Sequence, residues 1–422
     1  MRYFFVQIII MLIFAKTVSA EQFLNYGNID PFPKKFDIML SGDNKLSSSQ
    51  DAGTNVALSI INGLASLSDK NDLSNSPLYR VLTTYGAFFT VLWDHEISGH
   101  ALRAKEFKVK VSGFSLTSPF SAATHFSSNK KSAHLQQLAI ISLGGNEASY
   151  VLSKKLLNGL IEKNQAIDPV TAAAYMFSSG NQAFYVYAIN YKKSRANDLH
   201  AYISYMRKMY GRNSMSMSKI KSIGVLDFLD PTLVASIYSL ATGNDVKLPT
   251  IKLADNIRLL PSARMVLTPY GVIEKHLIAH VLTDYTNITT TFGFGKESKT
   301  TSSVIRKYNV SKSYPVGTFF GSTVTPKKHN TYFAELSATK VVSLDQLNLG
   351  LTVAHWSQPE LLTLDPYNAK IKKGYMLVLN TKYQVKDDLS IFADLGFKTK
   401  GFIVGQHLAK TPIIRAGFNW AL

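Results

Sequence analysis

Two histidines and a glutamate stand together at the end of an apolar run in this chain. His95, Glu96 and His100 lie within the segment Trp-Asp-His-Glu-Ile-Ser-Gly-His. The histidines are five positions apart, and in a regular α-helix that spacing turns two side chains about 140° apart. A π-type turn of about 4.4 residues would return both rings to one face, and Gly99 would ease the distortion. The alternative is that Glu96 and His100, four positions apart, form the functional pair.

The surroundings of this cluster favour a metal site. No charged residue occurs from Val81 to Trp93, and charges then begin abruptly at Asp94. Burying aspartate, histidine and glutamate beside an apolar helix is unfavourable unless these groups are paired or bind an ion. The competing explanation is a chance spacing, with hydrogen-bonded imidazoles and no metal. We expect His95 and His100 to supply two ligands to Zn²⁺.

A catalytic zinc site usually has a third protein ligand and an open position. Glu147 is the first choice for that ligand. It is the one charged residue in the apolar stretch 138–150, and its carboxylate needs a partner there. Asp198 and His200, at the start of a later predicted helix, are the reserve ligands.

Two other patterns carry weaker signals. A Gly-Asn pair recurs at 145–146 and 180–181 inside apolar predicted helices. An interior glycine costs a helix about 1 kcal/mol relative to alanine, so close packing or a polar site should compensate. His276 and His280, four positions apart without a glutamate between them, are a minor candidate metal pair.

The segment from His95 to His100 resembles the H-E-x-x-H helix of zinc metallopeptidases whose third ligand is a glutamate on a later helix. The spacer here has one extra residue. The pair Asn146-Glu147 is loosely similar to the segment that supplies the third ligand in that family. The resemblance covers only these two short segments. It implies hydrolysis of peptide bonds, with Glu96 as the general base that takes a proton from water.

The N-terminus indicates export. Arg2 precedes the apolar stretch 3–15, and Val18-Ser19-Ala20 is typical of a cleavage site, so residues 1–20 are predicted to be a signal peptide. The chain has no cysteine, which excludes disulfides and zinc-thiolate sites. Its net charge of +18 favours contact with membrane lipid or another anionic envelope surface. Export argues against nucleic acid as the partner.

The hydrophobic periodicity changes near residue 245. Residues 21–54 are predicted to be a linker, and residues 55–245 a helical metal-binding domain with polar residues inside its bundle. Helix starts are expected at the caps Asp168, Asn197 and Asp230. The predicted helices are 55–67, 78–106, 132–162, 169–191, 196–209 and 231–241.

From residue 246 to residue 422 apolar and polar residues alternate, which predicts roughly eight strands of about ten residues. One face of the last strand is apolar and carries Ile414, Ala416, Phe418, Trp420 and Leu422. This strand resembles the terminal strand of bacterial outer-membrane barrels, although it ends on leucine rather than on an aromatic residue. A soluble sandwich or lipocalin-like barrel is the alternative. The expected fold class is α+β, with an N-terminal helical bundle followed by a C-terminal antiparallel β-barrel-like sheet.

Three functions are consistent with these features. The first is a zinc-dependent hydrolase of a Gram-negative cell envelope, in the outer membrane or periplasm, with a peptide or protein as substrate. The second is a non-enzymatic outer-membrane β-barrel, or a structural or binding protein, with a helical accessory domain. The third is an intramembrane metalloprotease with residues 79–93 and 172–191 in the bilayer. No residue pattern indicates an organic cofactor.

Overall fold

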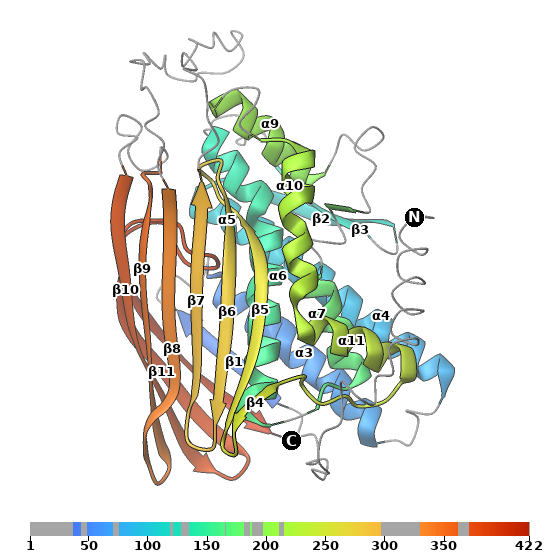
Figure 1. The fold of residues 1–422 in the computed structure, drawn as a ribbon. Helices are drawn as coiled ribbons and strands as arrows, with labels where there is room; N and C mark the ends of the chain where they lie inside the picture. The colour runs from blue at the N-terminus through green and yellow to red at the C-terminus, as the bar shows by residue number, and fades with distance from the viewer. Residues whose placement is uncertain are drawn as a thin grey trace.

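The structure is a mixed α+β fold, as predicted, with helices in the N-terminal half and a large antiparallel sheet in the C-terminal half (Figure 1). The computed structural model describes residues 37–43, 49–70, 76–118, 121–127, 135–164, 166–180, 186–187, 197–210, 215–296, 330–361 and 371–421. The predicted signal peptide lies outside these residues.

Most helices begin close to the predicted positions. They are α3 (Gln50–Lys70), α4 (Pro77–Asp94), the π-helix η3 (His95–Ala101), α5 (Leu102–Glu106), α6 (Leu135–Glu162), α7 (Pro169–Ser179), α9 (Asp198–Tyr210), α10 (Met217–Gly224), the 3₁₀-helix η5 (Val225–Leu229) and α11 (Pro231–Thr242). Asp168 and Asp230 cap α7 and α11 by accepting backbone N–H groups, and a proline follows each cap. Helices α10 and η5 were not predicted from the sequence. The helix predicted from residue 169 to residue 191 ends at Ser179 as α7, and most of the remaining range lies outside the described residues.

Ten strands form one antiparallel sheet in the order β1-β12-β11-β10-β9-β8-β7-β6-β5-β4. They are β1 (Asp37–Asp43), β4 (Ile251–Ala254), β5 (Ile257–Leu267), β6 (Ile273–Thr283), β7 (Asn287–Lys296), β8 (Asn330–Leu344), β9 (Leu347–Pro359), β10 (Ile371–Lys386), β11 (Leu389–Lys398) and β12 (Thr411–Ala421). A separate hairpin joins β2 (Val111–Ser118) to β3 (Ser121–Phe126). Although a linker is predicted for residues 21–54, β1 forms there and pairs with β12.

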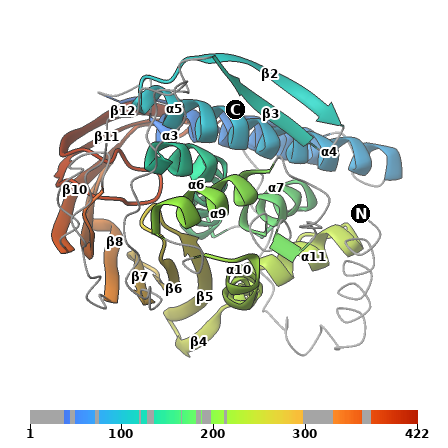
Figure 2. The same cartoon turned by 90° about the horizontal axis from the view of Figure 1, so that it is seen from above.

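The sheet curls around the helices but is not closed, and β1 and β4 are its two edges (Figure 2). Helix α3 lies against the β1 edge. There the Ser59 hydroxyl accepts a hydrogen bond from the Met39 N–H at 2.8 Å and lies 3.1 Å from the Met39 carbonyl oxygen. A helix side chain therefore satisfies part of the edge backbone that a further strand would otherwise pair with.

Helix α6 is the central element, buried along most of its length between the sheet and the other helices (Figure 2). On its sheet side, Lys154 forms an ion pair with Glu335 of β8 at 2.5 Å, beside a cavity of about 500 Å³. Arg264 of β5 donates to Ser153 of α6 at 2.5 Å and to Asp230 at 3.2 Å. These buried bonds fix α6 relative to the sheet, and its opposite side faces η3 and α9.

Among the described helices, none taken singly has the length and apolar character needed to cross a bilayer. The segments Met217–Leu229 and Pro231–Thr242, bent by 71° relative to one another, meet the requirement only as a pair.

Candidate metal centre

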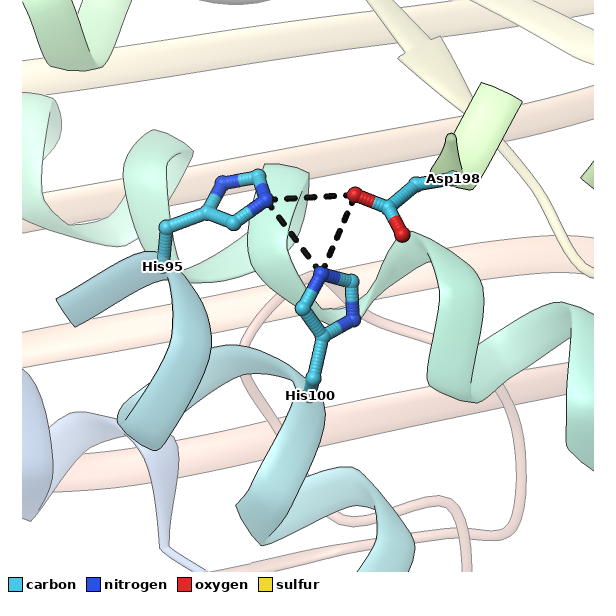
Figure 3. Close-up of side chains that lie close together, drawn as sticks. All are labelled: His95, His100 and Asp198. Carbon is cyan, nitrogen blue, oxygen red and sulfur yellow. Dashed lines mark hydrogen bonds and ion pairs between the residues drawn. The ribbon is translucent and has the colours of Figure 1, made fainter. Parts of the chain in front are cut away.

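A π-helix carries the two histidines that the sequence places five positions apart. His95 and His100 both belong to η3, which continues α4 without a break. Because a π-helix bonds each residue to the fifth one along, both rings lie on the same face. Figure 3 shows the two rings turned toward each other and toward Asp198, which comes from the start of α9. The π-turn interpretation is therefore confirmed over the regular-helix alternative.

Glycines allow η3 to approach α6 closely enough to fix this geometry. A Cβ atom on Gly99 would lie 2.5 Å from the Gly145 Cα, and one on Gly145 would lie 2.2 Å from the His95 Nε2. Real side chains cannot be accommodated at such distances, so both positions require glycine. The interior glycine of the first Gly-Asn pair is thus explained by close packing against the histidine.

Three ligand atoms form a nearly equilateral triangle. The His95 and His100 Nε2 atoms are 3.2 Å apart, and they lie 3.4 Å and 3.2 Å from the Asp198 Oδ2. In a tetrahedral zinc site with metal–ligand distances of about 2.05 Å, neighbouring ligand atoms are about 3.3 Å apart. The triangle therefore has the dimensions of one face of a zinc tetrahedron, and its fourth corner would be free for water or substrate.

Neighbouring groups orient both rings. The His100 Nδ1 lies 2.6 Å from the Ile141 carbonyl oxygen, which can only accept, so this nitrogen carries the proton. The His95 Nδ1 lies 3.4 Å from the Ser149 hydroxyl on the same helix α6. Such partners commonly fix the tautomer and the orientation of metal-binding histidines. In neutral His100, the Nε2 lone pair then faces the other two ligand atoms.

The electrostatics of the triangle favour a cation at its centre. A neutral His100 and an ionised Asp198 would place two acceptors 3.2 Å apart with no donor between them. Burial lowers the pKa of His100, but the charge and hydrogen bond of Asp198, with a smaller effect of Glu96, raise it to about 9. Burial raises the pKa of Asp198, yet the two histidines hold it well below its usual range. A proton or a metal ion between the His100 Nε2 and the Asp198 Oδ2 would remove this repulsion.

Glu96 is buried beside the triangle, one residue after the first histidine. Its Oε2 accepts a 2.6 Å hydrogen bond from the Thr124 hydroxyl on β3, and its charge contributes to the raised pKa of His100. The hairpin β2–β3 thus packs against η3 and fixes the glutamate. Sequence analysis did not identify Thr124, since nothing in the sequence connects β3 with η3.

The structure corrects the choice of third ligand. Glu147 does not join the histidines, because its carboxylate accepts two hydrogen bonds from the buried Arg103 guanidinium and a third from the Gly405 N–H at 3.2 Å. Asp198, the reserve candidate, is the carboxylate that lies next to the two histidines. His200 is not part of the triangle, and its described bond is a backbone N–H donated to the Asn197 cap at 2.9 Å.

His276 and His280 do not form a metal pair in the described part of the chain. Both lie on strand β6, where residues four apart share a face but are about 13 Å apart. His276 stacks on Phe333 and contacts Glu274 at 3.1 Å, and His280 contacts Thr289 at 2.9 Å. His95, His100 and Asp198 are the only described residues whose metal-ligating atoms cluster in this way.

Comparison of the chain with known protein families, curated proteins and solved structures finds no match. The argument for function therefore depends on the site itself.

Proposed function

We propose that this protein is a zinc-dependent hydrolase, with peptides or proteins as substrates. The observation that carries the proposal is the triangle of two imidazole nitrogens and one carboxylate oxygen with the edge lengths of a zinc tetrahedron. A set of two histidines and one carboxylate suits zinc and leaves one coordination position open.

In this proposal each residue has a distinct role. His95, His100 and Asp198 hold the ion, and zinc supplies the activation of water near neutral pH. Glu96 accepts the proton of the attacking water and returns it to the leaving amine. Thr124 holds the Glu96 Oε2, which leaves Oε1 to accept that proton. The similarity of the His-Glu segment to zinc metallopeptidases supports a peptide substrate.

The test is the metal content and the peptidase activity of the purified chain. We expect about one zinc ion per chain in the wild type and little in His100→Ala. Glu96→Gln should keep zinc but lower the cleavage of fluorescein-labelled casein about a hundredfold or more, because a general base typically contributes that factor. His125→Ala is the matched control, since this exposed histidine on β3 lies outside the triangle and should change neither quantity.

Two results would overturn the proposal. Full zinc occupancy in His100→Ala would remove the metal centre. Unchanged casein cleavage in Glu96→Gln would remove the catalytic role of the glutamate and favour a binding protein.

A second function, attachment to a lipid bilayer, is favoured by the outer face of the sheet. Paired positions across β9, β10, β11 and β12 form an apolar row whose members are all exposed: Leu351, Leu379, Leu395 and Ile414. A parallel row crosses β8 to β11 and consists of Leu336, Val353, Leu377 and Phe397. Contiguous exposed apolar surface of this extent is uncommon on soluble monomers and marks a contact surface.

The dimensions of this face suit acyl chains. On β10 the exposed apolar and aromatic residues of this face are Tyr375, Leu377, Leu379, Tyr383 and Val385, and the two tyrosines are about 26 Å apart. Outer-membrane sheets carry an apolar band about 25 Å tall flanked by aromatic residues. The opposite face is mixed: Met376 and Val378 belong to a buried apolar cluster, and farther along β10 Asn380 donates a hydrogen bond to Asp394 at 2.8 Å. Because the face is convex, a second convex copy would touch only a narrow part of it (Figure 2).

Vesicle flotation tests this attachment. We expect wild-type protein to float with phosphatidylcholine vesicles in about 1 M NaCl, where charges are screened beyond about 3 Å. The triple variant Leu351→Asn, Leu379→Asn, Leu395→Asn should float about tenfold less. Phe114→Asn with Leu116→Asn is the matched control, because these exposed residues lie on the separate hairpin. Equal flotation of the triple variant and the wild type would contradict lipid contact by this face.

A further inference from the structure

A small hollow lies next to the candidate metal centre, between α6, α7, η5 and β5. It is lined by Asn146, Ser149, Tyr150, Ser178, Ser179, Asp227 and Arg264, and it has a volume of about 10 Å³. A cavity of roughly this volume holds one water molecule. The hollow is next to the triangle, because Ser149 lines it and also contacts the His95 Nδ1 at 3.4 Å.

Three residues around the hollow leave buried polar atoms without a protein partner. The Asn146 side chain leaves both its Oδ1 and its Nδ2 in this state, although the residue is only 9% exposed. Asp227 uses Oδ1 to accept the Met265 N–H at 2.6 Å and leaves Oδ2 without a partner. Arg264 donates from both terminal nitrogens and leaves Nε without one. A buried polar group without a hydrogen bond is costly, so four such atoms around one hollow require a common partner.

The chemistry of the lining identifies that partner. Arg264 is already paired with Asp230 at 3.2 Å, and the lining holds a guanidinium as well as a carboxyl group, so no excess charge of either sign calls for an ion and a neutral occupant fits best. It must accept from the Arg264 Nε and the Asn146 Nδ2 while donating to an oxygen of Asn146 or Asp227. Water has this combination of donors and acceptors, and buried waters typically make about three hydrogen bonds.

We infer that one ordered water molecule occupies this hollow and, by holding Asn146 and α6 in place, positions Ser149 and through it His95. The inference explains the second residue of the Gly-Asn pair, whose glycine is explained by the His95 contact. Serines 178 and 179, just before the second Gly-Asn pair, line the same hollow. The positioning role depends on the proposed zinc site, whereas the bound water does not.

A crystal structure of the full chain at about 2 Å resolution would test the water directly, at a resolution where ordered waters are routinely seen. We expect one isolated density peak within about 3 Å of the Arg264 Nε and the Asn146 amide. An empty hollow would overturn the inference, as would direct bonds among Asn146, Asp227 and Arg264. This result is independent of whether the protein binds zinc, so it separates failure of this inference from failure of the proposed function.

Zinc affinity tests the positioning role. Asn146→Leu fills the hollow with an apolar group and should weaken zinc binding about tenfold. This is the lower end of the effects seen when residues that position metal ligands are replaced. Asn146→Ser keeps a hydroxyl and room for water, and should restore affinity to within about threefold of the wild type. Asn158→Leu on the same helix, which lines the large cavity instead, is the matched control and should leave affinity unchanged. Equal affinities in all four proteins would exclude the positioning role.

Discussion

Two polar clusters lie side by side where η3 and α5 pack against α6, and they differ in whether they are complete. In the first, Arg103 is paired with Glu147 and Glu106, and Glu147 also accepts the Gly405 N–H. In the second, His95, His100 and Asp198 direct three ligand atoms at one point. Both are largely buried, so the difference does not come from access to water alone.

This difference distinguishes an ion pair that is already satisfied from a group of residues that could hold a metal ion. The Arg103 cluster matches each carboxylate with donors of the same chain, so it needs no further ion. The triangle provides acceptors in excess and thus requires a proton or a metal. Burial as such does not mark a ligand site. A ligand site is marked instead by several hydrogen-bond acceptors that point at one place with too few donors to pair them.

The largest effects on stability and on zinc affinity are expected when one carboxylate is removed from each cluster. Glu147→Ala should lower the free energy of unfolding by about 3–5 kcal/mol, because it leaves the Arg103 charge buried and unpaired. Asp198→Ala should weaken zinc binding about a hundredfold, equivalent to about 2.7 kcal/mol, with a smaller effect on the stability of the zinc-free protein. Urea unfolding and zinc titration of both variants provide the two measurements.

Each variant is the control for the other. Folded Glu147→Ala should bind zinc within about threefold of the wild type, since its carboxylate lies outside the triangle. If Glu147→Ala instead abolished zinc binding in a folded protein while Asp198→Ala did not, the assignment of the two clusters would be reversed.

The comparison also shows what the sequence can reveal and where it fails. The five-residue spacing of His95 and His100 is a local pattern, so the sequence indicated that a shared site would need a π-turn, and the structure has that turn at η3. A partner for Glu147 was correctly expected from its apolar surroundings. That this partner is Arg103, only three residues after His100, depends on how two helices cross, and no local pattern encodes this. Asp198 was recognised only as a reserve for the same reason.

In the fold, too, elements with a local sequence pattern were predicted, whereas an element that depends on pairing with a distant segment was not. Strict alternation located strands such as Leu389–Lys398 and Leu347–Pro359, because a half-exposed strand has that pattern wherever it pairs. Asp37–Asp43 was missed because it is short and becomes a strand by pairing with β12, almost four hundred residues later. His276 and His280 were considered a minor metal pair because side chains four positions apart meet on a helix, but Ile273–Thr283 is a strand, where they do not.

The smallest effects are expected from substitutions of two glycines on α6, which test whether the close approach of this helix to His95 helps to form the triangle. A Cβ at Gly145 would meet the His95 ring, whereas a Cβ at Gly159 would meet nothing within 4 Å. Gly145→Ala should therefore displace the His95 ring and weaken zinc binding about tenfold, or about 1.4 kcal/mol. Gly159→Ala should leave zinc binding unchanged and raise the free energy of unfolding by about 0.5–1 kcal/mol, because alanine favours the helix. Isothermal titration with zinc and urea unfolding would measure both. If Gly145→Ala bound zinc as tightly as Gly159→Ala, the close approach of α6 to His95 would have no part in forming the triangle, and the ring would have to be held by η3 alone.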